Sequence, residues 1–337
     1  MAQTFHVETP FASVYRPVAN QGDGVLQAWT VHFWNREFFI STTLLISNIG
    51  PGEANNGVSL IFSRNANPVF FTAGYSSRSL TAEPGRFGVR IGRCRMYRNN
   101  DRIELHIRIP DVEMRLRLHP SGPGLFLDRP VAVSQNSNAN LRLDIPVPVA
   151  GAEGRIRLGH NPWFDLEGRA GMEYVYADHP IHPYGERLRL LRSFDPEQSI
   201  FLATYHGTDA ARAPYMGMAV ILRDGRIVRQ LPLSASDPAP ALQNLKSYPI
   251  GNPFRIVHAP VDTEGHCKLI ETQDRILAYF NFLDHVPLLV QYFMSFIPVE
   301  PGVLYSSGRL RTQCDDLPAR NQSVLISDYF MHAISMQ

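Results

Sequence analysis

Apolar and polar residues alternate one by one along much of the chain, and this period of two restricts the fold more than any other feature. The pattern is strict over residues 103–109 and 114–118. Successive side chains of a β-strand point to opposite faces, so such alternation is typical of strands that bury one face. Helical periodicity is scarce: only residues 284–296 and 323–334 allow a helix, and each competes with a strand. We therefore predict an all-β fold.

Turn-forming residues separate the alternating runs. Asp224-Gly225 stands between the apolar residues 218–222 and Ile227-Val228, where a type I′ hairpin turn requires positive φ. Further turns are indicated at Asn99-Asn100-Asp101, at Ser121-Gly122-Pro123-Gly124 and at Glu264-Gly265. Short strands joined by tight turns form an antiparallel meander, and closing it into a barrel is one way to remove its exposed edges.

The length of 337 residues predicts two domains, because single cores seldom grow beyond about 250–300 residues. The composition changes at the polar run 134–140, which is followed by the proline-rich residues 146–151. Such a change is typical of a linker or crossover. We predict an N-terminal β domain over 1–145 and a C-terminal β domain over 146–337.

Charge and motifs exclude several classes of function. The formal net charge is +1, so the basic surface that nucleic acid requires is not expected. No GxGxxG or GxxxxGK[ST] phosphate loop and no GxSxG elbow occurs. The most apolar window, 286–299, contains two prolines and is shorter than the roughly 20 residues of a membrane-spanning helix.

The three cysteines, Cys94, Cys267 and Cys314, are far apart and form no CxxC motif. An odd number at such spacing predicts neither a disulfide framework nor a zinc site, and it favours a reducing compartment. The N-terminus has no cationic or apolar signal region. We therefore expect a cytoplasmic protein; the sequence leaves its oligomeric state open.

Acids, imidazoles and phenols are concentrated in residues 176–184, near the middle of the chain. Pro180 and Pro183 interrupt regular pairing there, so Asp178 and His179 could turn toward one cavity as a general acid–base dyad. The alternative is a structural loop in which Asp178 accepts backbone N–H bonds. His182 adds a third polar group, but the spacing secures no three metal ligands, and we predict neither a metal nor a cofactor.

Tyr205 ends an apolar run and could donate a hydrogen bond to a ligand carbonyl or present its π face to a cation, although a wall tyrosine is the competing interpretation. Aromatic residues recur throughout the chain, and a subset lining a cavity would suit a long apolar or polycyclic ligand. The candidate catalytic residues are Asp178, His179 and Tyr205; the candidate substrate-binding residues are Trp34, Trp163, Tyr174, Tyr176, His182, His206, Tyr292 and Phe296.

The run Tyr176-Ala177-Asp178-His179 resembles the Tyr-x-Asp-His-x-Trp signature of the AttH and hydroxyneurosporene synthase (carotenoid hydratase) family. Looser similarity extends over most of the chain, including 186–205, 217–227 and 304–308. The resemblance implies two lipocalin-like domains packed side by side, with a site for a hydrophobic small molecule. Relatives in this family include hydratases, tocopherol cyclase-like proteins and decalin-forming Diels-Alderases.

Two departures from that signature order the functional hypotheses. Ile181 occupies the Trp position, and Gly207 occupies the position of the acid that the resemblance assigns to alkene protonation. Of the reactions in this family, ring closure depends least on the missing Trp and acid. It needs mainly a cavity that folds the substrate and one or two hydrogen-bond donors. We therefore predict a cofactor-independent cyclase, of the pericyclase or Diels-Alderase type, acting on a polyketide- or terpenoid-derived substrate. A non-catalytic lipid or isoprenoid carrier and a hydratase with Asp178 as the acid are the alternatives.

Overall fold

A computed structural model describes most of the chain. The described residues are 4–8, 25–47, 55–65, 67–82, 87–133, 139–179, 185–195, 197–208, 211, 215–234, 255–258, 267–281, 302–315 and 317–330. They contain strands and a single 3₁₀ turn, η2 (Ser77–Ser79), with no α-helix among them. The predicted all-β class is confirmed, and the chain consists of two antiparallel lipocalin-like β domains.

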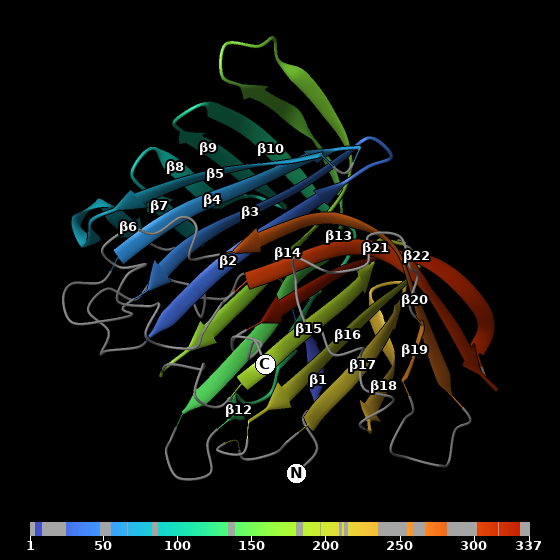
Figure 1. Cartoon of the computed structure of the whole chain (residues 1–337). Coiled ribbons are helices and arrows are strands. Elements are labelled where there is room, and N and C mark those ends of the chain that lie inside the picture. The colour runs from blue at the N-terminus through green and yellow to red at the C-terminus, as the bar shows by residue number, and fades with distance from the viewer. Residues whose placement is uncertain are drawn as a thin grey trace, which may run out of the picture.

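The first domain is a 14-stranded antiparallel sheet drawn in blue to green in Figure 1. Its main path runs β5-β4-β3-β2-β14-β13-β10-β9-β8-β7-β6, while β1 and β12 pair beside β11 and β13. The strands are β1 (Phe5–Glu8), β2 (Leu26–Trp34), β3 (Phe38–Ser47), β4 (Asn55–Arg64), β5 (Asn67–Tyr75), β6 (Leu80–Ala82), β7 (Gly88–Ile91), β8 (Cys94–Asn99), β9 (Arg102–Ile109), β10 (Val112–Pro120), β11 (Gly124–Leu127), β12 (Val131–Ala132), β13 (Asn140–Leu158) and β14 (Phe164–Ala177).

The second domain is an 8-stranded antiparallel sheet with the order β18-β17-β16-β15-β22-β21-β20-β19. Its strands are β15 (Gly185–Ser193), β16 (Gln198–Gly207), β17 (Tyr215–Arg223), β18 (Arg226–Leu233), β19 (Arg255–His258), β20 (Lys268–Asn281), β21 (Gly302–Cys314) and β22 (Leu317–Phe330). The last strand pairs with the first, which brings the C-terminal part of the chain back beside β15 (Figure 1). Both sheets are curved and lie against one another.

Two of the predicted turns form hairpins, β17–β18 and β8–β9, whereas the turn predicted at 121–124 joins β10 and β11, which do not pair with each other. Asp224 and Gly225 have φ of 51° and 71° between β17 and β18, and Asn100 has φ of 57° between β8 and β9. All three values are the positive φ that tight turns between twisted strands require. The turn predicted at Glu264-Gly265 lies outside the described residues.

Each sheet buries both of its faces, one in the core of its own domain and the other against the second domain. One face of the first sheet encloses a core around Trp29, Phe33 and Leu105, and one face of the second encloses a core around Leu202 and Ile221. The opposite faces meet between the domains, in one cluster that includes Phe5, Leu188 and Tyr205 and another that includes Phe39, Phe194 and Tyr305. The interface is therefore as thoroughly buried as the domain cores.

The sheet changes between Ala177 and Gly185, whereas residue 145, the predicted boundary, lies inside β13. The proline-rich run 146–151, expected to be a linker, is strand as well. Register shifts between Asp144 and Val147 and between Val147 and Ala150 admit the prolines, because a bulge residue needs no ladder hydrogen bond. We therefore propose that the crossover between the domains follows β14.

Of the two segments where a helix competed with a strand, 323–330 is strand within β22, and 284–296 lies outside the described residues. No helix in the described part of the chain is long and apolar enough to cross a membrane.

The N-terminal strand β1 connects the two domains through hydrogen bonds. The amide of Gln230 in β18 donates to the carbonyl of Phe5 at 2.6 Å and accepts from its N–H at 2.7 Å.

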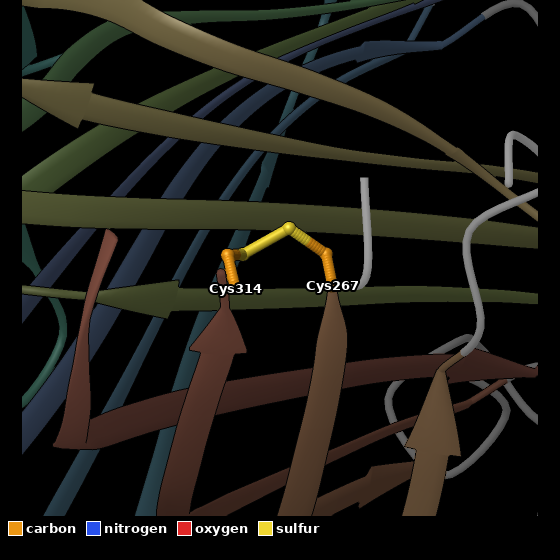
Figure 2. The surroundings of a disulfide bond; sticks show 2 residues. All are labelled: Cys267 and Cys314. Carbon is orange, nitrogen blue, oxygen red and sulfur yellow. A yellow bond between two sulfur atoms is a disulfide. The ribbon is translucent and has the colours of Figure 1, made fainter. Parts of the chain in front are cut away.

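Cys267 and Cys314 form a disulfide (Figure 2), so the expectation of no disulfide was wrong. Residues 268 and 313 are register partners on the adjacent strands β20 and β21, which places the two cysteines opposite each other with their Cα atoms 4.1 Å apart. Cys94 is buried and free. Structural disulfides persist in oxidising compartments, which weakens the argument for a reducing environment. The cytoplasmic location stays a prediction.

The disulfide closes a loop between residues 47 apart, and we expect its removal to destabilise the second domain. Loop-closure entropy for this length gives roughly 2–4 kcal/mol in the free energy of unfolding. Urea unfolding of Cys314→Ser should show that loss, and wild type treated with a reductant should show a similar one. A reductant that shifts the Cys314→Ser midpoint as much as the wild-type midpoint would contradict this assignment.

Candidate functional site at the domain interface

A polar layer lies buried between the two sheets. His32 of β2 and Glu173 of β14 come from the first sheet, and His32 Nε2 lies 3.3 Å from Glu173 Oε2. Arg192 of β15 comes from the second sheet and forms an ion pair with the other carboxylate oxygen, Oε1. All three side chains are almost fully buried. A charged pair is thus formed across the interface of the two domains.

Burial sets the protonation of this layer. Burial, and after it the positive charge of Arg192, holds the pKa of His32 well below its ordinary value, so the imidazole is neutral near pH 7. Burial also lowers the pKa of Arg192 to about 10, which leaves the guanidinium charged. With Nε2–H donating to Glu173, Nδ1 of His32 is an acceptor that has no partner in the described part of the chain.

Two phenols extend the polar layer. Tyr305 of β21 accepts a hydrogen bond from the Ser41 hydroxyl at 3.2 Å and shares another with Tyr329 of β22. The ring of Tyr305 packs edge-on against His32, with centroids 5.6 Å apart. Burial raises the pKa of both phenols, so they stay protonated. The layer therefore holds neutral hydroxyls next to one ion pair.

Gly171 makes room for the ion pair. It lies two residues from Glu173 on β14 and so shares its face toward the second sheet. A Cβ at this position would lie 3.2 Å from Nη1 of Arg192 and 3.2 Å from a ring carbon of Phe194. A larger side chain here would push Arg192 away from Glu173.

Next to the polar layer the interface opens into a cleft of about 600 Å³. The apolar part of its lining is formed by Trp34, Phe38, Phe39, Phe194 and Leu277, and the polar part by Asn35, Arg36, Glu37, Ser63, Asn65, Arg169, Asp195, Arg275, Ser307, Asn321, Gln322 and Ser323. The rings of Trp34 and Phe194, one from each domain, meet edge to face with centroids 6.0 Å apart.

Strand periodicity places the polar layer beside this cleft. Residues two apart on a strand point to the same face. His32 and Trp34 are related in this way on β2, and Tyr305 and Ser307 on β21. Arg192 and Phe194, which lies just past β15, have the same spacing. Phe39 joins the two regions, since it lines the cleft and its ring lies 5.2 Å from that of Tyr305. Phe39 thus contacts both the lining of the cleft and the polar layer, where its ring also stacks on that of His32.

Asp178 and His179 lie where β14 ends and the chain leaves the first sheet. Asp178 accepts hydrogen bonds from the backbone N–H of Asn140 at 2.7 Å and from its side-chain amide at 2.9 Å. Nδ1 of His179 lies 3.0 Å from Asp178 Oδ1, but about half of the imidazole is exposed. Burial alone would raise the pKa of Asp178, and the bonds from Asn140 outweigh it, so the pKa is lowered.

Tyr205 and Trp34 both lie at the domain interface, in different clusters. Tyr205 is buried in the apolar cluster around Phe5 and Leu188, and its hydroxyl has no hydrogen-bond partner among the described residues. Burial raises the pKa of this phenol strongly, so it stays protonated. Of all the predicted site residues that the structure describes, Trp34 alone lines the cleft.

The remaining predicted residues are dispersed. Tyr174 and Tyr176 pack with the core of the first domain, and Trp163 lies beside the β13–β14 hairpin beneath the guanidinium groups of Arg155 and Arg157. His206 stacks edge-on against Tyr215 on the second sheet. His182, Tyr292 and Phe296 lie outside the described residues.

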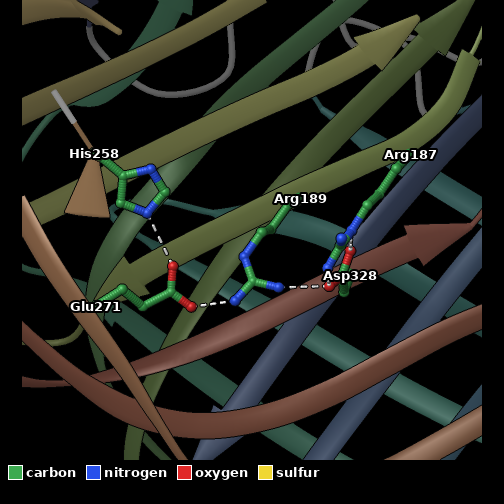
Figure 3. A network of polar contacts seen from close by, with 5 residues as sticks. All are labelled: Arg187, Arg189, His258, Glu271 and Asp328. Carbon is green, nitrogen blue, oxygen red and sulfur yellow. Dashed lines mark hydrogen bonds and ion pairs between the residues drawn. The ribbon is translucent and has the colours of Figure 1, made fainter. Parts of the chain in front are cut away.

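A second buried polar network crosses the interior of the second domain (Figure 3). His258 Nε2 lies 3.0 Å from Glu271, which pairs with Arg189, and Arg189 donates to Asp328 at 2.5 Å. Arg187 donates to the same carboxylate through Nε at 2.6 Å. Both arginines therefore have carboxylate partners. The described residues contain no group of three His, Cys, Asp or Glu side chains arranged to hold a metal ion.

The residues of the interface layer were not among the predicted site residues, although the sequence carries a signal for them. His32 and Glu173 stand between apolar neighbours, in Val31-His32-Phe33 and Met172-Glu173-Tyr174. An ionisable residue on the outer face of an alternating strand is normally solvated. A buried one must be paired, and only knowing which faces the second sheet covers distinguishes the two cases.

No protein-family model matches the chain, and no curated protein matches it. Solved structures match it over nearly its whole length. CghA, a Diels-Alderase, has a TM-score of 0.62 at 9% identity, covering 99% of this chain and 100% of CghA. Kievitone hydratase from Nectria haematococca has a TM-score of 0.59 at 7% identity, covering 96% of each chain. A putative AttH from Nitrosomonas europaea has a TM-score of 0.56 at 14% identity, covering 92% and 94%.

The chain has the AttH-like, lipocalin-like fold. The resemblance inferred from Tyr176-Ala177-Asp178-His179 is thereby confirmed at the level of the fold. Identities of this size leave the substrate and the reaction to be argued from the site itself.

Breaking the interface ion pair should destabilise the folded protein. Arg192→Met leaves the Glu173 carboxylate buried without its partner, and we expect a loss of about 3–5 kcal/mol in the free energy of unfolding. Replacing both residues, as Glu173→Met with Arg192→Met, should recover most of that loss, because no uncompensated charge remains. Urea unfolding of the two single variants and the double variant gives the coupling energy; losses that simply add would contradict the pairing.

The network of Figure 3 should make stability fall in acid. Burial alone would raise the pKa of Glu271, but Arg189 and His258 outweigh it and hold the pKa at about 2, against an ordinary value of 4.5. Because the folded-state pKa is depressed, its stabilisation is complete above the ordinary value and is lost as pH falls toward the lower one.

The melting temperature of wild type should therefore fall more steeply between about pH 5 and about pH 3 than that of Glu271→Gln. Glu186→Gln, at an exposed position of β15, is the matched control and should keep the wild-type slope. Equal slopes in wild type and Glu271→Gln would show that Glu271 does not titrate in this way.

Proposed function

We propose that this protein is an enzyme that binds a hydrophobic small molecule in the interface cleft and closes a ring within it. The observation that carries the proposal is the cleft of about 600 Å³, to which Trp34 and Phe39 of the first sheet and Phe194 and Leu277 of the second contribute apolar side chains. Cavities of this volume that combine apolar side chains with polar groups are typical small-molecule sites, although polar residues are the more numerous in this lining.

The walls of the cleft suit a reaction that depends on shape. Most lining residues belong to strands of two packed sheets, and rigid elements hold a bound molecule more closely than loops do. Folding a flexible substrate into a near-attack conformation supplies several kcal/mol of the barrier, on the order of 7–11 in favourable cases. A cyclisation driven this way requires no cofactor.

Comparison with solved structures supports an enzyme of this kind without deciding the reaction. The structural neighbours include a Diels-Alderase and a hydratase. Hydration through Asp178 fits the geometry less well, because the lowered pKa keeps this carboxylate ionised near pH 7 and Asn140 occupies both of its oxygens. A polyketide- or terpenoid-derived substrate is the class that we propose.

We propose Tyr205 as a hydrogen-bond donor only to a ligand that reaches the apolar cluster around Phe5 and Leu188, because Tyr205 does not line the cleft. Its buried hydroxyl has no partner among the described residues, and a buried hydroxyl without a partner costs about 1–3 kcal/mol unless a ligand or water supplies one. The proposed dyad of Asp178 and His179 likewise does not line the cleft, and about half of the imidazole is exposed, so we propose it as a base only for a ligand bound at the end of β14.

Extraction of the purified protein with organic solvent, followed by mass spectrometry, would identify a co-purified ligand. Returning that ligand to fresh protein then distinguishes the alternatives. An isomer of equal mass and different retention supports cyclisation, whereas a gain of one water molecule, labelled in heavy water, supports a hydratase. A ligand that is retained unchanged supports a carrier and would overturn the enzymatic proposal.

Filling the cleft should abolish binding without unfolding the protein. Ser307 lies on β21 and lines the cleft, so Ser307→Phe should remove the retained ligand and at least about 90% of any turnover, since its ring would occupy the space of the substrate. Ser121→Phe, at an exposed turn away from the cleft, is the matched control. Full ligand retention in Ser307→Phe, at an unchanged melting temperature, would place the ligand elsewhere.

A further inference from the structure

The cleft carries positive charge that nothing in the described part of the chain neutralises. Arg36, Arg169 and Arg275 line it, and no ion pair or hydrogen bond joins their side chains to another described residue. Arg169 belongs to β14 of the first sheet, and Arg275 belongs to β20 of the second. Both domains therefore bring an unpaired guanidinium to the same concave surface.

The acidic residues of the lining do not balance these charges, because each is already paired. Glu37 forms an ion pair with Arg64. Asp195 accepts hydrogen bonds from Gln322 and from the backbone N–H of residue 197, and it lies 3.7 Å from Arg320. Neither Arg64 nor Arg320 lines the cleft.

This local excess contrasts with the chain as a whole. The formal net charge is only +1, and most of the other charged groups of the interface are paired, as Arg192 is with Glu173. The side chains of all three arginines are exposed, and charges of one sign that line a cleft raise the local concentration of anions.

We propose that the natural ligand of the cleft is an amphipathic carboxylic acid. Its carboxylate would bind Arg169 and Arg275, and its hydrophobic body would lie on Trp34, Phe39 and Phe194. The planar guanidinium groups match a carboxylate with paired hydrogen bonds, which are the strong charge-assisted kind. This inference rests on the proposed function of the cleft and adds the chemical class of its ligand.

The anchoring has a consequence for catalysis. A charged end held by Arg169 and Arg275 fixes one end of a flexible substrate, so the remainder must fold against the aromatic residues of the lining. The two guanidinium groups would act as positioning residues rather than as acids, because arginine stays protonated in proteins. Weakening them should therefore raise KM more than it lowers kcat.

The test compares two probes that differ only in charge, dansyl-undecanoic acid and its primary amide, by fluorescence titration of the full-length protein. We expect the acid to bind roughly 10- to 100-fold more tightly than the amide at low salt, as expected for one or two charge-assisted hydrogen bonds. Arg169→Gln combined with Arg275→Gln should remove this preference while leaving the affinity for the amide unchanged.

Arg169→Lys with Arg275→Lys keeps the charge and should retain part of the preference. Arg226→Gln, at an exposed position of β18, is the matched control and should retain all of it. Melting temperatures equal to that of wild type would confirm that the variants fold.

Four outcomes would overturn the inference, and they differ in what they say of the proposed function. Equal binding of acid and amide by wild type, or a preference that survives in the double Gln variant, refutes the carboxylate site and leaves the hydrophobic cleft standing. Binding of neither probe refutes both. Binding that Ser307→Phe does not affect places the probe outside the cleft and likewise refutes both.

Discussion

The ion pair between Glu173 and Arg192 is the interaction on which the arrangement of the two domains depends. It joins strands of different sheets in a place that water does not reach. A buried pair contributes little net stability, since desolvation of both charges offsets their attraction. We infer that the pair acts on specificity, because a shift of one sheet against the other would leave two charges unpaired in an apolar interface. The cleft, formed by both sheets, requires the alignment that this pair selects.

One face of each sheet packs in the core of its own domain and the other packs in the interface, and β13 contributes residues to both. Its first part contributes Leu141, Leu143 and Ile145 to the interface cluster, and its second part contributes Ala152 and Ile156 to the core of the first domain. The register shifts around Val147 change which residues face the interface. A bulge moves the alternation by one residue, so the same strand can be buried on opposite faces along its length.

Much of the fold could be predicted from the sequence because alternation and turn chemistry are local. Residues 103–109 and the Asp224-Gly225 turn have the structure that their pattern indicates. Pairings between segments that are far apart in the sequence could not be predicted in this way. The partners β2 and β14, or Cys267 and Cys314, are brought together by strand order, which periodicity does not encode. For the same reason the prolines near residue 145 indicated a linker, although bulges admit them within a strand.

The site was harder to predict than the fold, because its residues look ordinary until their surroundings are known. Trp34 was recognised as an aromatic candidate, while Arg169 and Arg275 belong to a chain whose basic residues are nearly all arginine, so neither stood out by type. What distinguishes them is position: each lines a cleft whose carboxylates are already paired. An arginine in the lining is available to bind a ligand because no carboxylate of the protein pairs with it. That property belongs to the packed interface and not to the residue, so it emerges only when both sheets are in place.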